Sequence, residues 1–232
     1  MKKVLIDRYF TAIARRYDLA GAILSFGLHF GWKRAAINAL PPLEGALVLD
    51  VCGGTADLAL LAAERVGEKG RVIVCDVNSP MMEIGKAKAI RRRMRDRIQF
   101  SQGDAEELCF PAGTFAAATV GFGLRNLVHP EKGLSEIYRV LKPGGSLAIL
   151  EFSLPARPLR SLYDLYSLQV MPRAAGLICG TSEPFVYLAE SIRMFPAPER
   201  VAGMLAHAGF AAIRYRKLTG GLAAIYAARK DA

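Results

Sequence analysis

A glycine-rich turn between an apolar run and a helical pattern is the part of this chain best suited to bind a small molecule. The apolar run 47–51 continues into Cys52-Gly53-Gly54-Thr55-Ala56-Asp57. Doubly wound α/β proteins hold nucleotide-like ligands at such a junction. A second apolar run, 72–75, ends in Asp76, and these folds place an acidic residue there on the ribose hydroxyls of an adenosine ligand. Together the two features predict an adenosine site containing Gly53, Gly54, Thr55 and Asp76.

The spacing of this turn favours S-adenosylmethionine over a dinucleotide. It lacks the G-x-G-x-x-G pattern that brings backbone amides to a pyrophosphate. Asp57 would repel a pyrophosphate at the helix start but would tolerate a zwitterionic methionine group and a cationic sulfonium. Asp104, after a third strand, and the backbone amides beside it are placed to bind the adenine edge. We expect Asp50 to be a structural and electrostatic anchor of the turn.

Apolar β-type runs alternate with helical patterns along the chain, which predicts an α/β fold with a doubly wound, mostly parallel seven-stranded sheet. The segment Lys142-Pro143-Gly144-Gly145 ends the third predicted helix and turns the chain into the next strand. The expected parallel strands are 46–51, 71–76, 98–102, 116–121 and 146–151, with helices at 57–66, 79–94 and 131–141. A helix at 198–209 and an antiparallel strand pair, 213–217 and 222–227, complete the pattern.

Two segments fall outside the alternation and are interpreted as a cover for the site within a single domain, 1–232. Residues 1–40 are expected to form an N-terminal helical cap of one or two amphipathic helices. Residues 153–197, the lid segment, form a long aromatic-rich passage next to the predicted substrate position. Its aromatic residues are Tyr163, Tyr166, Phe185, Tyr187 and Phe195.

The bulk composition predicts a cytoplasmic protein with one α/β core. The chain has 232 residues, 52% of them hydrophobic, with no apolar stretch of spanning length and no signal-peptide core. Its four cysteines lack metal-type spacing, so we expect no metal site and reduced, mostly buried thiols. The net charge of +10 suits either nucleic acid or an anionic membrane face.

Four segments resemble the ubiquinone/menaquinone biosynthesis C-methyltransferases. The run Arg139-Val140-Leu141-Lys142-Pro143-Gly144-Gly145-Ser146-Leu147-Ala148-Ile149-Leu150-Glu151-Phe152-Ser153 is similar to the C-terminal signature of that family. Tyr17-Asp18, Ser25, Gly27, His29 and Trp32 fit its N-terminal signature. Phe122-Gly123-Leu124-Arg125-Asn126 and Tyr187-Leu188-Ala189-Glu190-Ser191-Ile192-Arg193 also match, so the resemblance covers nearly the whole chain.

The resemblance implies a Rossmann-like class I methyltransferase fold, S-adenosylmethionine as methyl donor and a prenylated benzoquinol or naphthoquinol as acceptor. It places cofactor contacts at Thr55, Asp76, Asp104, Ala105 and Gly121. Three positions depart from the family. Ala56 replaces a usual glycine, which a helical backbone would absorb, Gly121 replaces a usual serine, and Ala20-Gly21 replace a Met-Asn pair.

Methylation of a ring carbon requires electron density there, which a hydroquinone gains when a neighbouring hydroxyl loses its proton. A guanidinium near that oxygen lowers the pKa of the phenol. Arg125 is the candidate for this role, facing the site directly or through water, and Asn126 beside it would orient the water or the ring oxygen. Tyr187 and Arg193 are weaker candidates for contacting the quinol. We expect His29 to make a structural hydrogen bond.

If the acceptor is a lipid, the net positive charge of the chain would attract the protein to an anionic membrane surface. The run Arg91-Arg92-Arg93-Met94-Arg95-Asp96-Arg97 is either a solvated helix end or part of that contact. Apolar faces around Ile23, Leu24, Phe26 and Phe30 and around Leu162, Leu165 and Leu168 would line a path for the prenyl tail. A homodimer or a larger quinone-biosynthesis complex is consistent with this interpretation of a lipid acceptor at the membrane.

Several other functions remain open from the sequence. The closest is a methyltransferase of the same fold acting on another small aromatic or on another quinone carbon, because donor sites are shared while acceptor pockets vary. A nucleic-acid methyltransferase is favoured only by charge, since no Asn-Pro-Pro segment follows the fourth strand and no Pro-Cys nucleophile is present. A non-catalytic, cofactor-binding scaffold and, last, an NAD oxidoreductase complete the alternatives.

Overall fold

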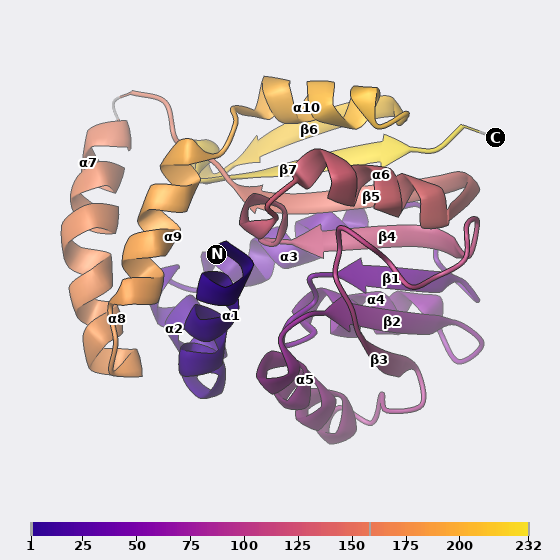
Figure 1. The fold of residues 1–232 in the computed structure, drawn as a ribbon, viewed down its shortest axis with the longest axis horizontal. Helices are drawn as coiled ribbons and strands as arrows, with labels where there is room; N and C mark the ends of the chain where they lie inside the picture. Colours follow the sequence, from indigo (N-terminus) through magenta and orange to yellow (C-terminus); the bar gives the residue numbers. More distant parts are fainter. Residues whose placement is uncertain (1, 158, 232) are drawn as a thin grey trace.

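Seven strands form one sheet in the order β3-β2-β1-β4-β5-β7-β6 in this computed structural model, which describes residues 2–157 and 159–231 (Figure 1). Strands β1 to β5 pair in parallel, and β7 pairs antiparallel with both β5 and β6. The doubly wound, mostly parallel sheet predicted from the sequence is therefore confirmed. The strands are β1 Leu47–Val51, β2 Arg71–Asp76, β3 Ile98–Gln102, β4 Phe115–Gly121, β5 Leu141–Phe152, β6 Ala211–Leu218 and β7 Ala223–Arg229.

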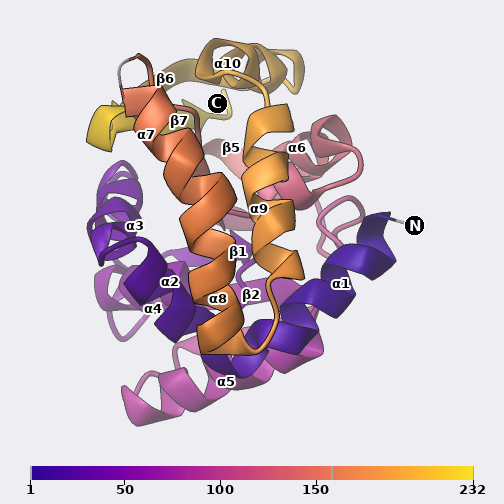
Figure 2. The same cartoon turned by 90° about the vertical axis from the view of Figure 1, so that its left-hand side faces the viewer.

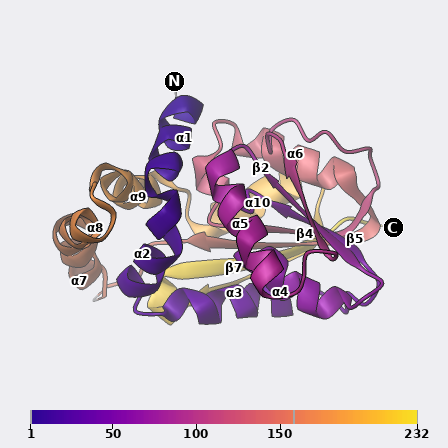
Figure 3. The same cartoon turned by 90° about the horizontal axis from the view of Figure 1, so that it is seen from below.

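Helices cover both faces of the sheet, because successive residues of each strand point to opposite sides. Val48 of β1 belongs to the core under α3, α4 and α5, while Leu49 belongs to the core under α6 and α10 (Figure 3). These helices are α3 Leu28–Asn38, α4 Asp57–Val66, α5 Ser79–Arg91, α6 Pro130–Val140 and α10 Pro198–His207. Because helices bury both faces of the parallel strands, the sequences of these strands are almost continuously apolar.

A further group of helices lies at the edge of the sheet to which the parallel strands point (Figures 1 and 2). It comprises α1 Lys2–Ile13, α2 Tyr17–Leu24, α7 Leu159–Leu165, α8 Met171–Cys179 and α9 Glu183–Met194. Ile13, Ala20, Met171 and Phe185 form their own small core. The N-terminal segment and the lid segment thus pack together over the carboxyl ends of the strands, as expected. One or two helices were predicted for residues 1–40, but the described part of this segment, 2–40, holds three α-helices.

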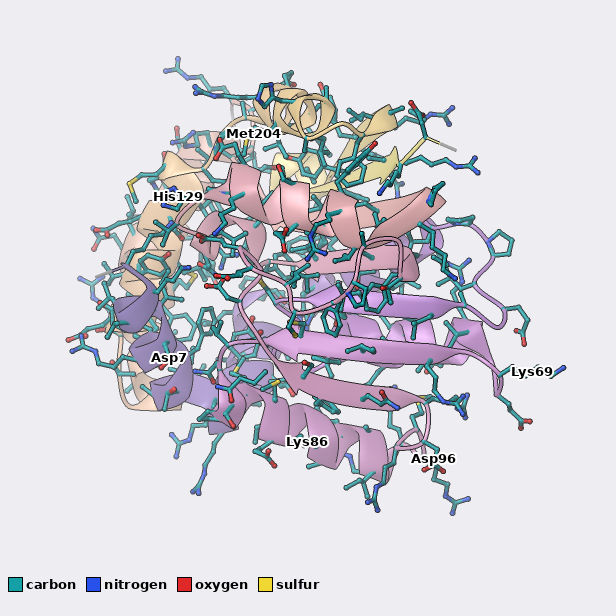
Figure 4. All side chains as sticks on the ribbon, turned by 45° about the vertical axis from the view of Figure 1, so that its right-hand side comes forward. Asp7, Lys69, Lys86, Asp96, His129 and Met204 are labelled. Atoms are coloured by element: carbon teal, nitrogen blue, oxygen red, sulfur yellow. The ribbon has the colours of Figure 1, made fainter. Side chains whose placement is uncertain are left out.

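The basic run 91–97 lies far from that edge. Helix α5 begins beside the end of β2 and ends at Arg91, earlier than the predicted residue 94, and Arg93 turns left-handed with φ 57° before β3 begins. The run therefore sits at the amino-terminal edge of the parallel strands. Figure 4 shows Asp96 of this run at the end of the molecule away from Asp7 of α1. The run and the lid segment thus lie at opposite edges of the sheet, and a membrane contact of the run stays a prediction.

Smaller predictions have mixed outcomes. His29 is buried, and its Nδ1 lies 2.7 Å from Oγ of Ser25, which confirms a structural hydrogen bond. The four cysteines are free, but only Cys75 is fully buried, so the expectation of mostly buried thiols is wrong. Among the described residues, no helix combines the length and apolarity needed to cross a bilayer.

Candidate active site

Three non-glycine residues with left-handed backbone conformation lie in the loops at the carboxyl ends of β1 and β4. They are Cys52, Ala56 and Phe122, with φ of 54°, 65° and 56°. Such conformations cost of order 1–3 kcal/mol each and concentrate at functional sites. The expectation that a helical backbone accommodates Ala56 is therefore wrong: ψ is 28°, and the residue is the left-handed N-cap of α4. Glycine would adopt this conformation without the Cβ penalty.

These loops surround a cavity of about 370 Å³. It is closed by residues of α1 and by Tyr17 of α2. All seven residues predicted to bind the cofactor line it, namely Gly53, Gly54, Thr55, Asp76, Asp104, Ala105 and Gly121. Asn126 lines it too, whereas Arg125, Tyr187 and Arg193 do not. The loops after β1, β2, β3 and β4 are thus brought to one space, as expected for the edge of a parallel sheet where ligands bind.

Asp76 is held at the end of β2 by two backbone amides. The amide of Gly54 donates to Oδ2 and that of Asn78 donates to Oδ1, each at 2.8 Å. Burial raises the pKa of Asp76, and these hydrogen bonds oppose the rise. A carboxylate has about four acceptor sites, so both oxygens keep capacity for ribose hydroxyls.

Asp50 ties the glycine turn to the sheet. Its Oδ2 accepts from the amide of Ala59 at 3.0 Å, and its Oδ1 accepts from the hydroxyl of Thr119 at 2.6 Å. Burial raises the pKa of Asp50 to about 7, against the effect of both hydrogen bonds. The geometry supports the anchoring role expected from the sequence.

Helix α1 closes the cavity above Asp104. Lys3 donates to Oδ2 of Asp104 at 2.6 Å and lies 3.3 Å from the buried Glu106. Burial alone would raise the pKa of Asp104, but Lys3 and the Glu106 amide lower it. The carboxylate of Asp104 is therefore engaged by the helix and by its own turn, which leaves the neighbouring backbone at Ala105 as the better candidate for the adenine edge. Sequence reasoning missed Lys3 and Glu106, whose partners are remote in the chain.

Thr55 is part of a charged cluster that the sequence analysis also missed. Its hydroxyl donates to Oδ1 of Asp18 at 2.7 Å and accepts from Lys88 at 3.2 Å. Lys33 donates to Oδ2 of Asp57 at 2.5 Å, and Lys88 contacts the other oxygen of that carboxylate. The Thr55 side chain is thus already committed to protein partners, although the residue lines the cavity.

Gly121 is the last residue of β4, and the side chain of Leu58 occupies the space beside it. A Cβ at this position would lie 2.7 Å from Cδ1 of Leu58. Leu58 therefore takes up the room that a side chain at position 121 would need, and a serine there would require that leucine to move.

Arg125 lies behind the cavity wall and not in it, which corrects the expectation that it faces the site. Its Nη1 donates to Oε1 of Glu151 at 2.9 Å and to the carbonyl of Phe122, and its guanidinium lies over the ring of Phe152 at 5.2 Å. Both members of the ion pair are buried, and Nε of Arg125 is buried without a hydrogen-bond partner in the part of the chain that the structure describes. Glu151 was missed as a site residue, although a carboxylate ending an apolar strand was a visible signal.

Asn126 is the polar side chain that reaches the cavity from this loop. Its Oδ1 accepts from the hydroxyl of Tyr187 on α9 at 3.2 Å, so two predicted site residues meet. Tyr17 also lines the cavity, and burial raises its pKa to about 12. Its hydroxyl therefore stays protonated at neutral pH and can donate a hydrogen bond.

Arg193 stands apart from these groups. It donates to Oδ1 of Asp164 at 2.5 Å, to Oγ of Ser167 at 2.9 Å and to the carbonyl of Ala189 at 2.7 Å. These contacts fasten α9 to α7 and to the π-helical turn Tyr166–Val170. The structure thus gives Arg193 a place inside the lid segment, away from the cavity.

The chain is similar to known proteins over nearly its whole length. The chain matches the ubiE/COQ5 methyltransferase family over residues 1–230. It is 42% identical over 229 residues to a Bradyrhizobium sp. protein named Ubiquinone/menaquinone biosynthesis C-methyltransferase UbiE, covering 97% of this chain and 90% of that one. The protein of the same name from Pectobacterium atrosepticum is 41% identical over 226 residues, with the same coverage. Among solved structures, a SAM-dependent methyltransferase from Thermotoga maritima, described as a possible histamine N-methyltransferase, superposes with a TM-score of 0.68 at 18% identity, covering 97% and 100% of the two chains.

Proposed function

The chain belongs to the ubiE/COQ5 methyltransferase family, and from this premise we propose that it methylates a ring carbon of a prenylated quinol in respiratory quinone biosynthesis, with S-adenosylmethionine as donor. The names of its relatives support the substrate class. The observation that carries the proposal is that the seven residues predicted to bind the cofactor and Asn126 line the same cavity. The acceptor is a benzoquinol or a naphthoquinol, the two ring types implied by those names.

The residues around the cavity fit the donor. Its volume of about 370 Å³ lies within the range of small-molecule sites. Asp76 offers unused acceptor sites to the ribose, and the backbone near Ala105 is placed for the adenine. Gly54 turns left-handed, with φ 51°, directly beside Asp76. When bound, S-adenosylmethionine supplies an electrophilic methyl group on a cationic sulfonium.

The acceptor ring is proposed to lie toward β4 and α9. Asn126, held by Tyr187, is placed to orient a ring oxygen, and the protonated hydroxyl of Tyr17 is a second donor to it. Closure by α1 and by Tyr17 of α2 excludes water and aligns the reacting atoms. Arg125 acts from behind the wall. Its charge favours a phenolate, but the carboxylate of Glu151 offsets much of that effect.

A membrane contact follows from a prenylated substrate. Helices α2, α7 and α8 lie at the end of the molecule that faces the viewer in Figure 2. Exposed apolar side chains occur on these helices, on α3, and on the turns that join α2 to α3 and α7 to α8. They are Ile23, Phe26, Phe30, Leu162, Leu165, Leu168, Val170 and Leu177, the apolar face. The rings of Phe26 and Tyr166 lie 5.8 Å apart and join its two parts. We propose that this apolar face, with the exposed Arg15, Arg16 and Arg173 around it, meets an anionic membrane peripherally and admits the prenyl tail.

Product analysis tests the catalytic proposal. The purified chain is incubated with S-adenosylmethionine and either reduced demethylmenaquinone or the unmethylated benzoquinol, and the quinones are examined by mass spectrometry. One added methyl group on either ring, absent with Asn126→Ala, is expected. Binding of the donor without transfer to either ring would overturn the proposed reaction and favour another acceptor or a non-catalytic scaffold.

A further inference from the structure

Four charged side chains from four different helices meet beside the glycine turn. They are Asp18 of α2, Lys33 of α3, Asp57 of α4 and Lys88 of α5. Burial alone would raise the pKa of Asp57, but the two lysines outweigh it and lower that pKa to about 2. Asp57 is therefore ionised at neutral pH, and two acidic side chains face two basic ones in the cluster.

The two lysines of this cluster differ in how many of their N–H donors remain unused. An ammonium has three N–H donors. Lys88 has three acceptors within reach, Oδ2 of Asp18 at 2.9 Å, the hydroxyl of Thr55 at 3.2 Å and Oδ1 of Asp57. Its donors are all used, and it does not line the cavity.

Lys33 has unused donors at the cavity. Its one acceptor among residues 2–157 and 159–231 is Oδ2 of Asp57 at 2.5 Å, which leaves two donors. Its side chain is 12% exposed and lines the cavity. A largely desolvated ammonium with free donors at a binding cavity is suited to an anionic group of the ligand.

The order of the strands tells which ligand group reaches this position. With the adenine at the loop after β3 and the ribose at Asp76 after β2, the remaining end of the donor runs toward β1 and the start of α4, since the sheet order is β3-β2-β1-β4. That end is an amino acid whose only anionic group is its α-carboxylate. We propose that Lys33 binds the α-carboxylate of S-adenosylmethionine, held in place by Asp57. This inference rests on the proposed function and deepens its cofactor site.

A purely structural role for Lys33, as an ion pair that fastens α3 to α4, makes a different prediction. Removal of a structural ion pair would weaken every adenosine ligand alike, because it would disturb the turn itself. Removal of a carboxylate contact weakens only ligands that carry the carboxylate. The choice of ligands therefore separates the two roles without any measurement of activity.

Isothermal titration calorimetry of the full chain provides the test. S-adenosylhomocysteine carries the whole amino acid. Decarboxylated S-adenosylmethionine keeps the amine and has a sulfonium but lacks the carboxylate, and methylthioadenosine lacks both the amine and the carboxylate. Lys33→Met is expected to weaken S-adenosylhomocysteine binding about 10- to 100-fold, the usual loss for a charge-assisted hydrogen bond. It should change the affinities of the other two ligands less than about threefold, within the context-dependence of such contacts. Lys33→Arg, which keeps the charge, should restore most of the affinity.

Lys86→Met is the matched control, because Lys86 lies on α5 with an exposed side chain paired to Glu83 (Figure 4). It should leave all three affinities unchanged. Equal weakening of the three ligands by Lys33→Met, or no weakening of any, would overturn the inference. If the unaltered chain binds neither S-adenosylhomocysteine nor methylthioadenosine, the proposed cofactor itself is wrong, and the inference falls with it.

Discussion

Nη1 of Arg125 lies 2.9 Å from Oε1 of Glu151, and the two side chains are only 6% and 0% exposed. Glu151 also accepts from the backbone amides of Arg125 and Phe152. This carboxylate therefore holds the loop after β4 against the end of β5, in addition to balancing the arginine. The pair links the stability of the fold to the shape of the acceptor side of the cavity.

Glu151→Ala should lower the free energy of unfolding by about 3–5 kcal/mol, because it leaves the buried Arg125 without its counter-charge. Denaturant titration measures this difference. Glu183→Ala is the control, since Glu183 is 68% exposed and lies 3.8 Å from Arg8. That variant should change stability by less than about 1 kcal/mol. A loss of similar size in both variants would contradict a special role for the buried pair.

Replacing both members of the pair should separate stability from catalysis. Arg125→Met with Glu151→Met is expected to unfold at a higher denaturant concentration than either single variant, because no unpaired charge remains buried. Methyl transfer should stay at the level of the Arg125→Met single variant if the arginine favours the phenolate. Recovery of activity together with stability would show that Arg125 acts only on the fold.

The hydroxyl of Tyr187 should contribute to catalysis through Asn126. Tyr187→Phe removes one partly buried hydrogen bond, so kcat/KM for the quinol should fall about 3- to 10-fold. Tyr215→Phe serves as control, because Tyr215 lies on the edge strand β6 and its hydroxyl donates to the exposed Glu199 of α10. Steady-state kinetics with both variants would detect the difference, and equal rates would place Asn126 away from the reacting ring.

Asp50 should make stability depend on pH in a recognisable direction. Its pKa of about 7 in the folded chain lies above the usual value of 3.8, so the folded state binds the proton more tightly than the unfolded chain. The contribution is complete below about pH 4 and is lost as the pH rises toward 7, with a magnitude on the order of 4 kcal/mol. The stability of the unaltered chain relative to Asp50→Asn should therefore fall over this range. Asp96→Asn, at an exposed position, should show no such trend.

The apolar face should carry the membrane contact. Phe26→Asp with Leu177→Asp places charges at side chains that are 78% and 87% exposed, so the fold should tolerate them. Cosedimentation with vesicles of phosphatidylglycerol and phosphatidylcholine should drop at least about tenfold. Ile90→Asp, on α5 and 59% exposed, is the control and should bind as the unaltered chain does. Undiminished binding by the double variant would place the contact elsewhere.

Much of this molecule follows from local sequence. The apolar runs that end in Asp50 and Asp76 predicted β1 and β2, and the glycine turn predicted the start of α4 at Asp57. Periodicity and turn residues act between near neighbours, so they are readable without a structure. Most of the seven residues predicted to bind the cofactor were proposed from such local signals, because they lie at or shortly after the ends of strands, whereas Ala105 and Gly121 were proposed from the family resemblance.

The tertiary structure alone decided which side chains are partners. Arg125 and Glu151 are 26 residues apart, and Lys33 reaches Asp57 across 24. No local pattern encodes such pairs, because they depend on which helix the sheet brings to which strand end. The same is true of Ala56, whose left-handed conformation is imposed by the turn between strand and helix. The sequence therefore determined the elements and the family, while packing determined which charges are free to meet a ligand.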